Sequence, residues 1–258
     1  MTLTFLGTAS GLPSAHRYHA STLVTRKEGT LLLDCGVNVS MFLKQKGLEA
    51  DFLDGIWLSH AHSDHIGGFS NLIQGLWLQK RRRELKIYAP QLLIEILQEE
   101  LNERLLFSSL LGFPLKWQSI RENTVFSCGT FSLSGFATSH LDSLKKKVGK
   151  NFSKACFECY GVIWEREGKC WVYSSDLSVP EDLEKIWSKP VEGLICELAH
   201  FPPEKLFSYL KNKSLRYLYL THYDDYWFGQ ESKIRSLALE QGISAEVKLV
   251  KDNETLIV

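Results

Sequence analysis

The chain has 258 residues, of which 44% are hydrophobic and 12% aromatic, enough to bury the core of one large α/β domain or two small ones. Thirty Lys and Arg balance thirty Asp and Glu, so the formal net charge at pH 7 is zero. This balance excludes binding of nucleic acid or an anionic membrane through a global positive field. An anionic substrate must instead be attracted by a local group of charges.

The N-terminal residues "MTLTFLGTASG" lack the basic start and the apolar centre of a signal peptide. No apolar run reaches the roughly 18 residues that span a bilayer. The cysteines are scattered, which is more typical of reduced thiols than of a disulfide framework. "CFEC", Cys156–Cys159, has metal or redox spacing but lacks the second pair that a tetrahedral zinc site needs. We therefore expect a cytoplasmic protein without a membrane contact.

Strand and helix patterns alternate along the chain without repeats or linkers, which predicts one domain over residues 1–258. The pattern predicts strands at Leu3–Gly7, Ser21–Thr25 and Thr30–Gly36, with "RKEG" as a hairpin turn between the last two.

Further along, amphipathic periodicity predicts helices at Phe69–Arg83, Leu92–Leu106 and Gln230–Gly242. The first of these has a cationic end, Lys80–Arg83, that stabilises a helix C-terminus. Ser178 and Glu181 have the spacing of a capping box and predict a helix start. The tail Ala245–Val258 is typical of a hairpin.

The segment "IWLSHAHSDHIGGF" crowds His60, His62, Asp64 and His65 between an apolar run and two glycines. Such groups repel one another when protonated and lose solvation when buried, so they need a compensating partner. Imidazole and carboxylate suit zinc, manganese or iron better than magnesium or calcium. His60 and His62 can face one metal from an extended segment, while Asp64 and His65 on the following turn can face a second.

Five predicted strands end in a residue that could bind a metal or act in catalysis: His60, His140, Asp176, Glu197 and His222. The carboxyl ends of strands in α/β sheets share one rim, where ligands gather. Two metal ions roughly 3.5 to 4 Å apart can share a water, lower its pKa and stabilise a developing oxyanion. The pattern therefore favours a two-metal hydrolytic site.

These residues carry a family resemblance. "SHAHSDHIGG" is similar to the signature of the metallo-β-lactamase superfamily, and "FLGTASGLPSAHRYHASTLV" with "LLLDCG" resembles the start of ribonuclease Z, the tRNA 3′-end endonuclease. The resemblance implies an α/β fold, a four-layer αββα metallo-β-lactamase sandwich with the site at one edge of the two sheets. It implies a first metal on His60, His62 and His140, a second on Asp64, His65 and His222, and Asp176 as the bridge. In the family, the signature aspartate also orients or deprotonates the attacking water, a role that Asp64 would take here.

Single positions of this sequence distinguish it from other members of the superfamily that it resembles. Zinc β-lactamases have a cysteine where this sequence has Asp176, and flavodiiron proteins have a glutamate at the position of His62. A glyoxalase-like thioesterase shares all seven ligands. The start of the chain favours a phosphodiester substrate, and so does His200, which with Glu197 resembles the histidine and glutamate that protonate the leaving oxygen in ribonuclease Z-like enzymes. Phe201 and Pro202 depart from that pattern, and His200 could simply precede the proline at a helix start.

The resemblance weakens between His140 and Asp176, where no long Gly/Pro-rich arm is visible. This interval contains Lys145, Lys146, Lys147, Lys150 and Lys154, which could neutralise phosphates or form a solvated loop. His16, Arg17 and His19 lie in a loop that the family keeps near the site, but no role is assigned to them. The aromatic residues of "YDDYWF" suit an interface, a substrate wall or the core, and the resemblance makes a homodimer plausible.

The sequence thus predicts a metal-dependent hydrolase with two divalent ions, zinc first and Mn²⁺ or Fe²⁺ as alternatives. Its substrate is expected to be a phosphodiester, tRNA or another RNA, hydrolysed by a metal-bridging hydroxide. The alternative is a small-molecule hydrolase that acts on a cyclic nucleotide, another phosphodiester or a thioester. An alternative of another class is a metal-binding sensor or interaction module with little turnover, which would have no need of a complete two-metal ligand set.

Overall fold

The computed structural model describes residues 1–27, 29–166 and 168–258, which form two seven-stranded sheets. The first sheet runs β14 (Glu254–Ile257), β1 (Thr2–Gly7), β2 (Ser21–Arg26), β3 (Gly29–Leu33), β4 (Gly55–Trp57), β5 (Leu85–Ala89) and β6 (Leu115–Ser119). The second runs β13 (Glu246–Leu249), β12 (Tyr217–Thr221), β11 (Val191–Glu197), β10 (Lys169–Tyr173), β9 (Tyr160–Arg166), β8 (Phe131–Ala137) and β7 (Val125–Cys128). The predicted turn "RKEG" includes Glu28, which lies outside the described residues.

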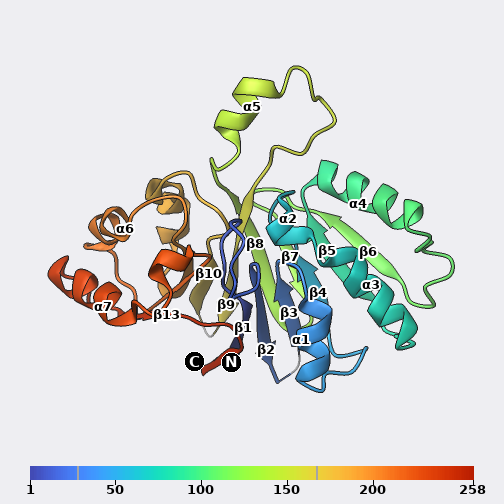
Figure 1. The fold of residues 1–258 in the computed structure, drawn as a ribbon, viewed down its shortest axis with the longest axis horizontal. Helices are drawn as coiled ribbons and strands as arrows, with labels where there is room; N and C mark the ends of the chain where they lie inside the picture. The colour runs from blue at the N-terminus through green and yellow to red at the C-terminus, as the bar shows by residue number, and fades with distance from the viewer. Residues whose placement is uncertain (28, 167) are drawn as a thin grey trace.

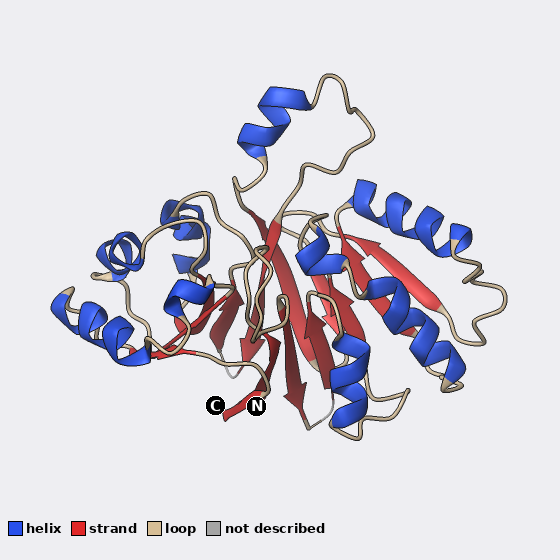
Figure 2. Cartoon of the chain, in the orientation of Figure 1, coloured by secondary structure: helices blue, strands red, loops and turns tan. Residues whose placement is uncertain are grey.

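Helices cover the outer face of each sheet (Figures 1 and 2). On the first sheet these are α1 (Val39–Gln45), α3 (Phe69–Leu78) and α4 (Gln91–Glu103), which share one apolar core with its strands. On the second they are η1 (Pro180–Ser188), α6 (Pro203–Leu210) and α7 (Glu231–Glu240). The short helices α2 (Ser63–Ile66), α5 (Asp142–Val148) and η2 (Asp225–Trp227) lie in connections. The predicted four-layer αββα sandwich is therefore confirmed.

A third core holds the two sheets together. Its largest members, Trp57, Trp164 and Trp171, are fully buried, and the rings of Trp164 and Trp171 stack with centroids 6.3 Å apart. A buried aromatic side chain contributes on the order of 2 to 3 kcal/mol through removal of apolar surface from water. Gly193 leaves room for this stack, because a Cβ there would lie 2.4 Å from the Trp171 ring.

The cationic segment after α3 has a different role from the one predicted. The helix ends at Leu78 and has no basic residue in its last turn. The side chain of Arg81 instead turns inward, is fully buried, and donates hydrogen bonds to the carbonyls of Ala50, Leu53, Arg83 and Glu84. Burial lowers the pKa of Arg81 to about 10. This guanidinium fastens a loop to the sheet and does not stabilise a helix end.

In the C-terminal half the predicted helix after Ser178 is present, but its capping box and the predicted hairpin of the tail were wrong. The segment after Ser178 forms the 3₁₀ helix η1, and no side chain caps its start. The Ser178 amide donates to Asp182 Oδ2 at 2.9 Å, and this bond replaces the predicted capping box with Glu181. The tail is no hairpin either, because β13 pairs with β12 in the second sheet while β14 pairs with β1 in the first.

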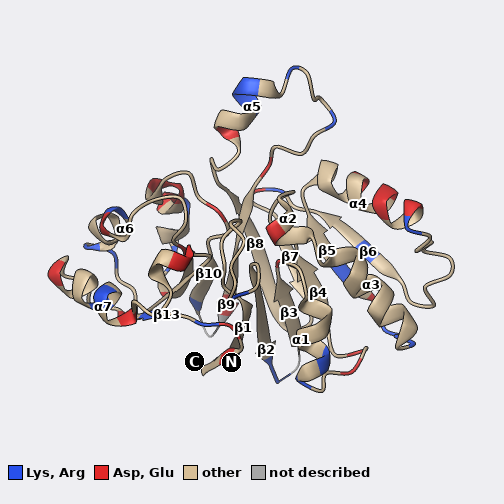
Figure 3. Cartoon of the chain, viewed as in Figure 1, with Lys and Arg blue, Asp and Glu red and all other residues tan. Residues whose placement is uncertain are grey.

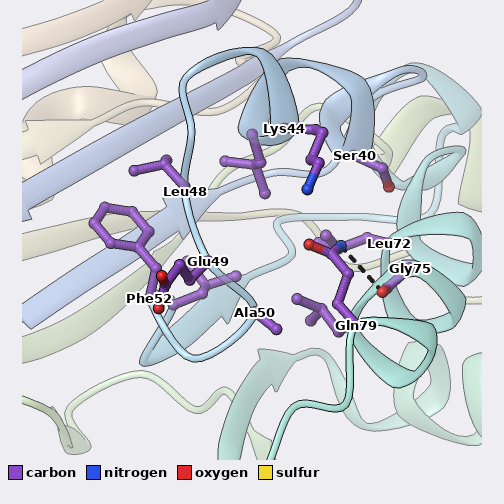
Figure 4. Close-up of a pocket in the computed structure, with 12 residues that line it drawn as sticks. Ser40, Lys44, Leu48, Glu49, Ala50, Phe52, Leu72, Gly75 and Gln79 are labelled. Atoms are coloured by element: carbon purple, nitrogen blue, oxygen red, sulfur yellow. Dashed lines mark hydrogen bonds between the residues drawn. The ribbon is translucent and has the colours of Figure 1, made fainter.

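The lysine-rich interval after His140 contains the helix α5, which projects from the sandwich with its connecting segment (Figure 1). Figure 3 shows mostly positive charge on this projection, with one acidic position, Asp142, in the first turn of α5, while both signs are mixed over the remaining elements. A cavity of about 20 Å³ between α1, the following loop and α3 is lined by residues such as Ser40, Lys44 and Gln79 (Figure 4) and includes none of the predicted metal ligands. No helix among the described residues is long and apolar enough to cross a membrane.

Candidate metal centre

The predicted metal ligands converge from both sheets. His60 follows β4, and His62, Asp64 and His65 lie at or in α2. From the second sheet, His140 follows β8, Asp176 follows β10 and His222 follows β12. His222 has a φ of 48°, and Ser175, just before Asp176, has a φ of 54°. Left-handed backbone at residues other than glycine costs energy and is concentrated at functional sites, so both chain reversals indicate such a site.

The first group of candidate ligands is His60, His62, His140 and Asp176, whose ligand atoms lie within 4.8 Å of one another. Asp176 Oδ2 is 3.7 Å from His60 Nε2 and 3.6 Å from His140 Nε2. His140 Nε2 is also 3.3 Å from His62 Nδ1. Three imidazole nitrogens and one carboxylate oxygen thus surround one point, a donor set that suits zinc, manganese or iron.

The second group is Asp64, His65 and His222, again within 4.8 Å of one another. Asp64 Oδ2 is 3.4 Å from His65 Nε2 and 3.1 Å from His222 Nε2. Asp176 turns its other oxygen, Oδ1, toward this group, at 3.2 Å from His65 Nε2. One carboxylate therefore faces both groups, as the predicted bridge requires.

The buried polar atoms of this site fit bound cations. Among the residues that the structure describes, His60 Nε2, His222 Nδ1 and Asp176 Oδ1 are buried without a hydrogen-bond partner. Burial, and next the neighbouring His65, lower the pKa of His60 far below its usual range. For His65 burial acts in the same direction but is outweighed by Asp176 and Asp34, which raise its pKa. A neutral imidazole has a lone pair for a metal, and a cation would satisfy the orphaned atoms.

Asp34, directly after β3, orients two of the candidate ligands. Its carboxylate is fully buried, and Oδ2 lies 2.7 Å from His65 Nδ1 and accepts hydrogen bonds from Tyr173 Oη at 2.7 Å and Ser59 Oγ at 3.0 Å. Ser59 Oγ is in turn 3.0 Å from His60 Nδ1. Asp34 thus fixes the ring orientation of one histidine from each group, which leaves their Nε2 atoms for a metal.

His200 and Glu197 are brought together as the sequence predicted. His200 Nδ1 lies 2.9 Å from Glu197 Oε1, and Glu197, which is buried, also accepts the backbone N–H groups of Leu177, Ala199 and His200. Burial opposes protonation of His200, but the hydrogen bond and charge of Glu197 outweigh it and raise the pKa of His200 to about 8. The His200 ring lies 4.6 Å from that of His140, so this imidazole stands beside the first group of candidate ligands.

A cavity of about 280 Å³ opens onto the ligands and is lined by His62, Asp64, Asp176, His222, Ala199, His200, Ser10, Gly11, Leu12 and Asp224. Part of this lining comes from two loops, an N-terminal loop (residues 8–19) and a rim loop (residues 223–228). Arg17, to which the sequence assigned no role, joins them. Its buried guanidinium donates to the carbonyls of Thr8 and Tyr223 and to Asp225 Oδ1, at 3.0, 2.6 and 2.8 Å.

The sequence thus predicted the candidate ligands that the fold brings together, but not the groups that support them, Asp34 and the two loops. Asp34 had a usable signal, because it ends the apolar run "TLLLD" as the ligand-type residues end theirs. Asp224 had none, since an aspartate in "YDDYWF" is an ordinary surface residue until the fold brings it to Ser10. Arg17 lies in a loop that the resemblance places near the site, but its partners Tyr223 and Asp225 are far from it in sequence.

Comparison with known proteins agrees with this geometry. The fold is the metallo-β-lactamase fold: the metallo-β-lactamase-fold protein YhfI of Bacillus subtilis superposes with a TM-score of 0.74 at 22% identity, over 99% of this chain and 98% of that one. The short form of human tRNase Z superposes with a TM-score of 0.74 at 19% identity, over 100% and 99% of the two chains.

The family model of Anti-Pycsar protein Apyc1 matches residues 1–242, and the chain belongs to this family. Among curated proteins, the ribonuclease Z of Aeropyrum pernix is 35% identical over 128 residues, which cover 49% of this chain and 40% of that protein. The ribonuclease Z of Methanocaldococcus jannaschii is 27% identical over 222 residues, 72% of this chain and 69% of that protein. The chain thus resembles ribonuclease Z, as its motifs predicted, and these relatives support a hydrolase.

Proposed function

We propose that the protein is a phosphodiesterase that uses two divalent metal ions, zinc first and manganese or iron as alternatives. The observation that carries this proposal is the set of seven side chains from both sheets, in two groups that share the carboxylate of Asp176. His60, His62 and His140 would hold one ion and Asp64, His65 and His222 the other. Bound there, the ions would neutralise phosphate charge and lower the pKa of a water.

The chain's own residues supply the proton transfers. In this proposal Asp64 orients the attacking water and takes its proton as the new P–O bond forms. His200, protonated through its contact with Glu197, donates its proton to the ester oxygen as the old P–O bond breaks. The products are a phosphomonoester and an alcohol, and the proton taken by Asp64 balances the one given by His200.

A compact substrate, a cyclic nucleotide, fits the site best. The cavity of about 280 Å³ is of the size of a single nucleotide rather than of an RNA acceptor stem. Its lining includes the carboxylate of Asp224, and the chain has no net positive charge that would attract a polyanion. A single phosphate can be held by the metal centre alone.

A second candidate is cleavage of tRNA or another RNA, which the relatives named ribonuclease Z favour. The lysines of α5, Lys145, Lys146 and Lys147, stand on the projection that begins just after His140 and could contact phosphates beyond the scissile one.

One assay separates these candidates. Metal-loaded protein is incubated with 3′,5′-cyclic nucleotides, with bis(p-nitrophenyl) phosphate and with a 3′-extended tRNA, each beside a chelated control. The proposal expects chelator-sensitive opening of cyclic nucleotides and an intact transcript. A single cut near the acceptor stem would show that the substrate is RNA and not a cyclic nucleotide. Absence of hydrolysis of all three substrates would refute the proposed phosphodiesterase activity.

Variants test the roles of the ligands. His62→Ala removes a ligand of the first ion, and Asp64→Ala removes both a ligand of the second and the group that orients water. Each is expected to abolish turnover, a loss of at least about 10³-fold, without unfolding the protein. Circular dichroism verifies the fold, and full activity in either variant would contradict the mechanism.

A further inference from the structure

The residues that line the cavity beside the candidate metal ligands fall into three groups with different chemistry. Candidate metal ligands form one part and the segment Ala199–His200 another, while the rest comes from Ser10, Gly11, Leu12 and Asp224. A phosphodiester held by the ligands presents its leaving oxygen to His200. By elimination, the part of the substrate beyond the phosphate contacts the two loops. Gly11 lies against the ligands themselves, because a Cβ there would be 3.2 Å from Asp64 Oδ2.

Asp224 is the charged group of this loop lining. The buried hydroxyl of Ser10 donates to Asp224 Oδ1 at 2.5 Å, and the Ser10 amide donates to the carbonyl of Tyr223 at 3.3 Å. Asp224 Oδ2 has no hydrogen-bond partner within the described parts of the chain, and the side chain is only partly buried. An ionised carboxylate only accepts hydrogen bonds, so Asp224 Oδ2 can accept one from a donor group on the substrate.

The segment that carries Asp224 is fixed on both sides. Arg17 binds the carbonyl of Tyr223 before it and the carboxylate of Asp225 after it, and its guanidinium lies 4.0 Å from the centre of the Tyr223 ring. Farther along the rim loop, the rings of His16 and Phe228 stack with centroids 5.5 Å apart. An acceptor held in place before binding loses little entropy on binding, which makes it suited to recognition.

We infer that Asp224, fixed by Ser10, is a specificity-determining residue that accepts a hydrogen bond from the sugar hydroxyl of a nucleotide substrate; this inference rests on the proposed function. The sugar hydroxyl is the donor nearest to the phosphate in a cyclic ribonucleotide, and Asp224 is two residues from the candidate ligand His222. A base amino group is farther from the phosphate and is absent from some bases. The same carboxylate repels a second phosphate and so disfavours polynucleotides.

The test compares three substrates: a 3′,5′-cyclic ribonucleotide, its 2′-deoxy counterpart and bis(p-nitrophenyl) phosphate, which has no sugar. Metal-loaded wild-type protein, Asp224→Ala and Asp224→Asn are assayed, with Glu204→Gln as the control because Glu204 is an exposed carboxylate on α6 outside the cavity lining. A hydrogen bond to a charged group corresponds to about a 10- to 100-fold effect on kcat/KM.

The wild type and Glu204→Gln should prefer the ribonucleotide over the deoxynucleotide by that factor. In Asp224→Ala the preference should fall to about onefold, through a rise in KM for the ribonucleotide, while the rate on bis(p-nitrophenyl) phosphate stays within about twofold. A wild type that does not discriminate, a preference that survives in Asp224→Ala, or an equal loss on all substrates would overturn the inference. Those results leave the phosphodiesterase standing, whereas a wild type inactive on all three substrates rejects the proposed function itself.

Discussion

At the scale of single residues, the site depends on the groups that orient the candidate ligands as much as on those ligands. Asp34 Oδ2 accepts two hydroxyl hydrogen bonds and contacts His65 in a place without solvent. If the acceptor is removed, these buried hydroxyl donors lose their hydrogen-bond partner, which lowers the free energy of unfolding. The orientation of His65 therefore depends on a residue that touches no substrate.

Asp34→Asn tests this support. The amide keeps the volume but turns an N–H₂ group toward donors, so we expect a loss of about 2 to 4 kcal/mol in the free energy of unfolding. Metal affinity should fall about 10- to 100-fold. Urea denaturation and metal titration measure the two effects. Tyr173→Phe is the matched control, since it removes one hydrogen bond and should cost only about 1 kcal/mol; equal losses in both variants would argue against the support by Asp34.

His200 gives a prediction about pH. Its raised pKa of about 8 means that the imidazolium is present at neutral pH and is lost as pH rises through that value, so activity should decline on the alkaline side. In Glu197→Gln the pKa of His200 falls and the decline should move to lower pH. In His200→Ala the rate should fall about 10²- to 10⁴-fold and this limb should disappear. An unchanged pH–rate profile in both variants would rule out His200 as the acid.

At the scale of elements, strand ends could be predicted from sequence and long-range partners could not. The apolar runs that end in His60, His140, Asp176 and His222 do bring these residues together, because chain direction in an α/β sheet places strand ends on one rim. The prediction of a hairpin for the tail was wrong because the alternating pattern of β13 and β14 predicts two strands but does not indicate which sheet each strand joins. The role predicted for Arg81 was wrong because an arginine that stabilises a helix C-terminus and one that is buried against loop carbonyls occur in the same local sequence.

The projection α5 distinguishes compact from extended substrates. Substitution of Lys145, Lys146 and Lys147 by alanine removes its positive charge without touching the cavity lining. We expect hydrolysis of a cyclic nucleotide to change by less than about twofold, with the same dependence on salt concentration. Assays between low and high salt measure this. A large loss, strongest at low salt, would mean that the projection holds a substrate with several phosphates.

At the scale of the whole molecule, the candidate metal centre joins the two sheets. His60, Asp64 and His65 belong to the first sheet's side, and His140, Asp176 and His222 to the second. Metal binding to the folded state alone adds stability in proportion to the logarithm of metal concentration over the dissociation constant. In the proposed two-metal centre, bound ions would therefore stabilise the packing of one sheet on the other as well as activate water.

Removal of metal should accordingly destabilise the whole chain. Dialysis against a chelator is expected to lower the Tm by roughly 5 to 15 °C, and added zinc should restore it. Calorimetry measures the shift. Asp176→Ala, which loses the shared carboxylate, should show a much smaller difference between loaded and chelated protein. An identical Tm with and without metal in the wild type would speak against a centre that bridges the sheets.

The most direct test of the central claim is the number of metal ions bound per chain, measured by native mass spectrometry after zinc loading and removal of excess metal. The account predicts two ions per chain in the wild type, because the ligands form two groups that share Asp176. It predicts that Asp64→Ala retains the first ion and loses the second. A wild type that binds one ion or none would contradict the two-metal centre on which the proposed chemistry depends.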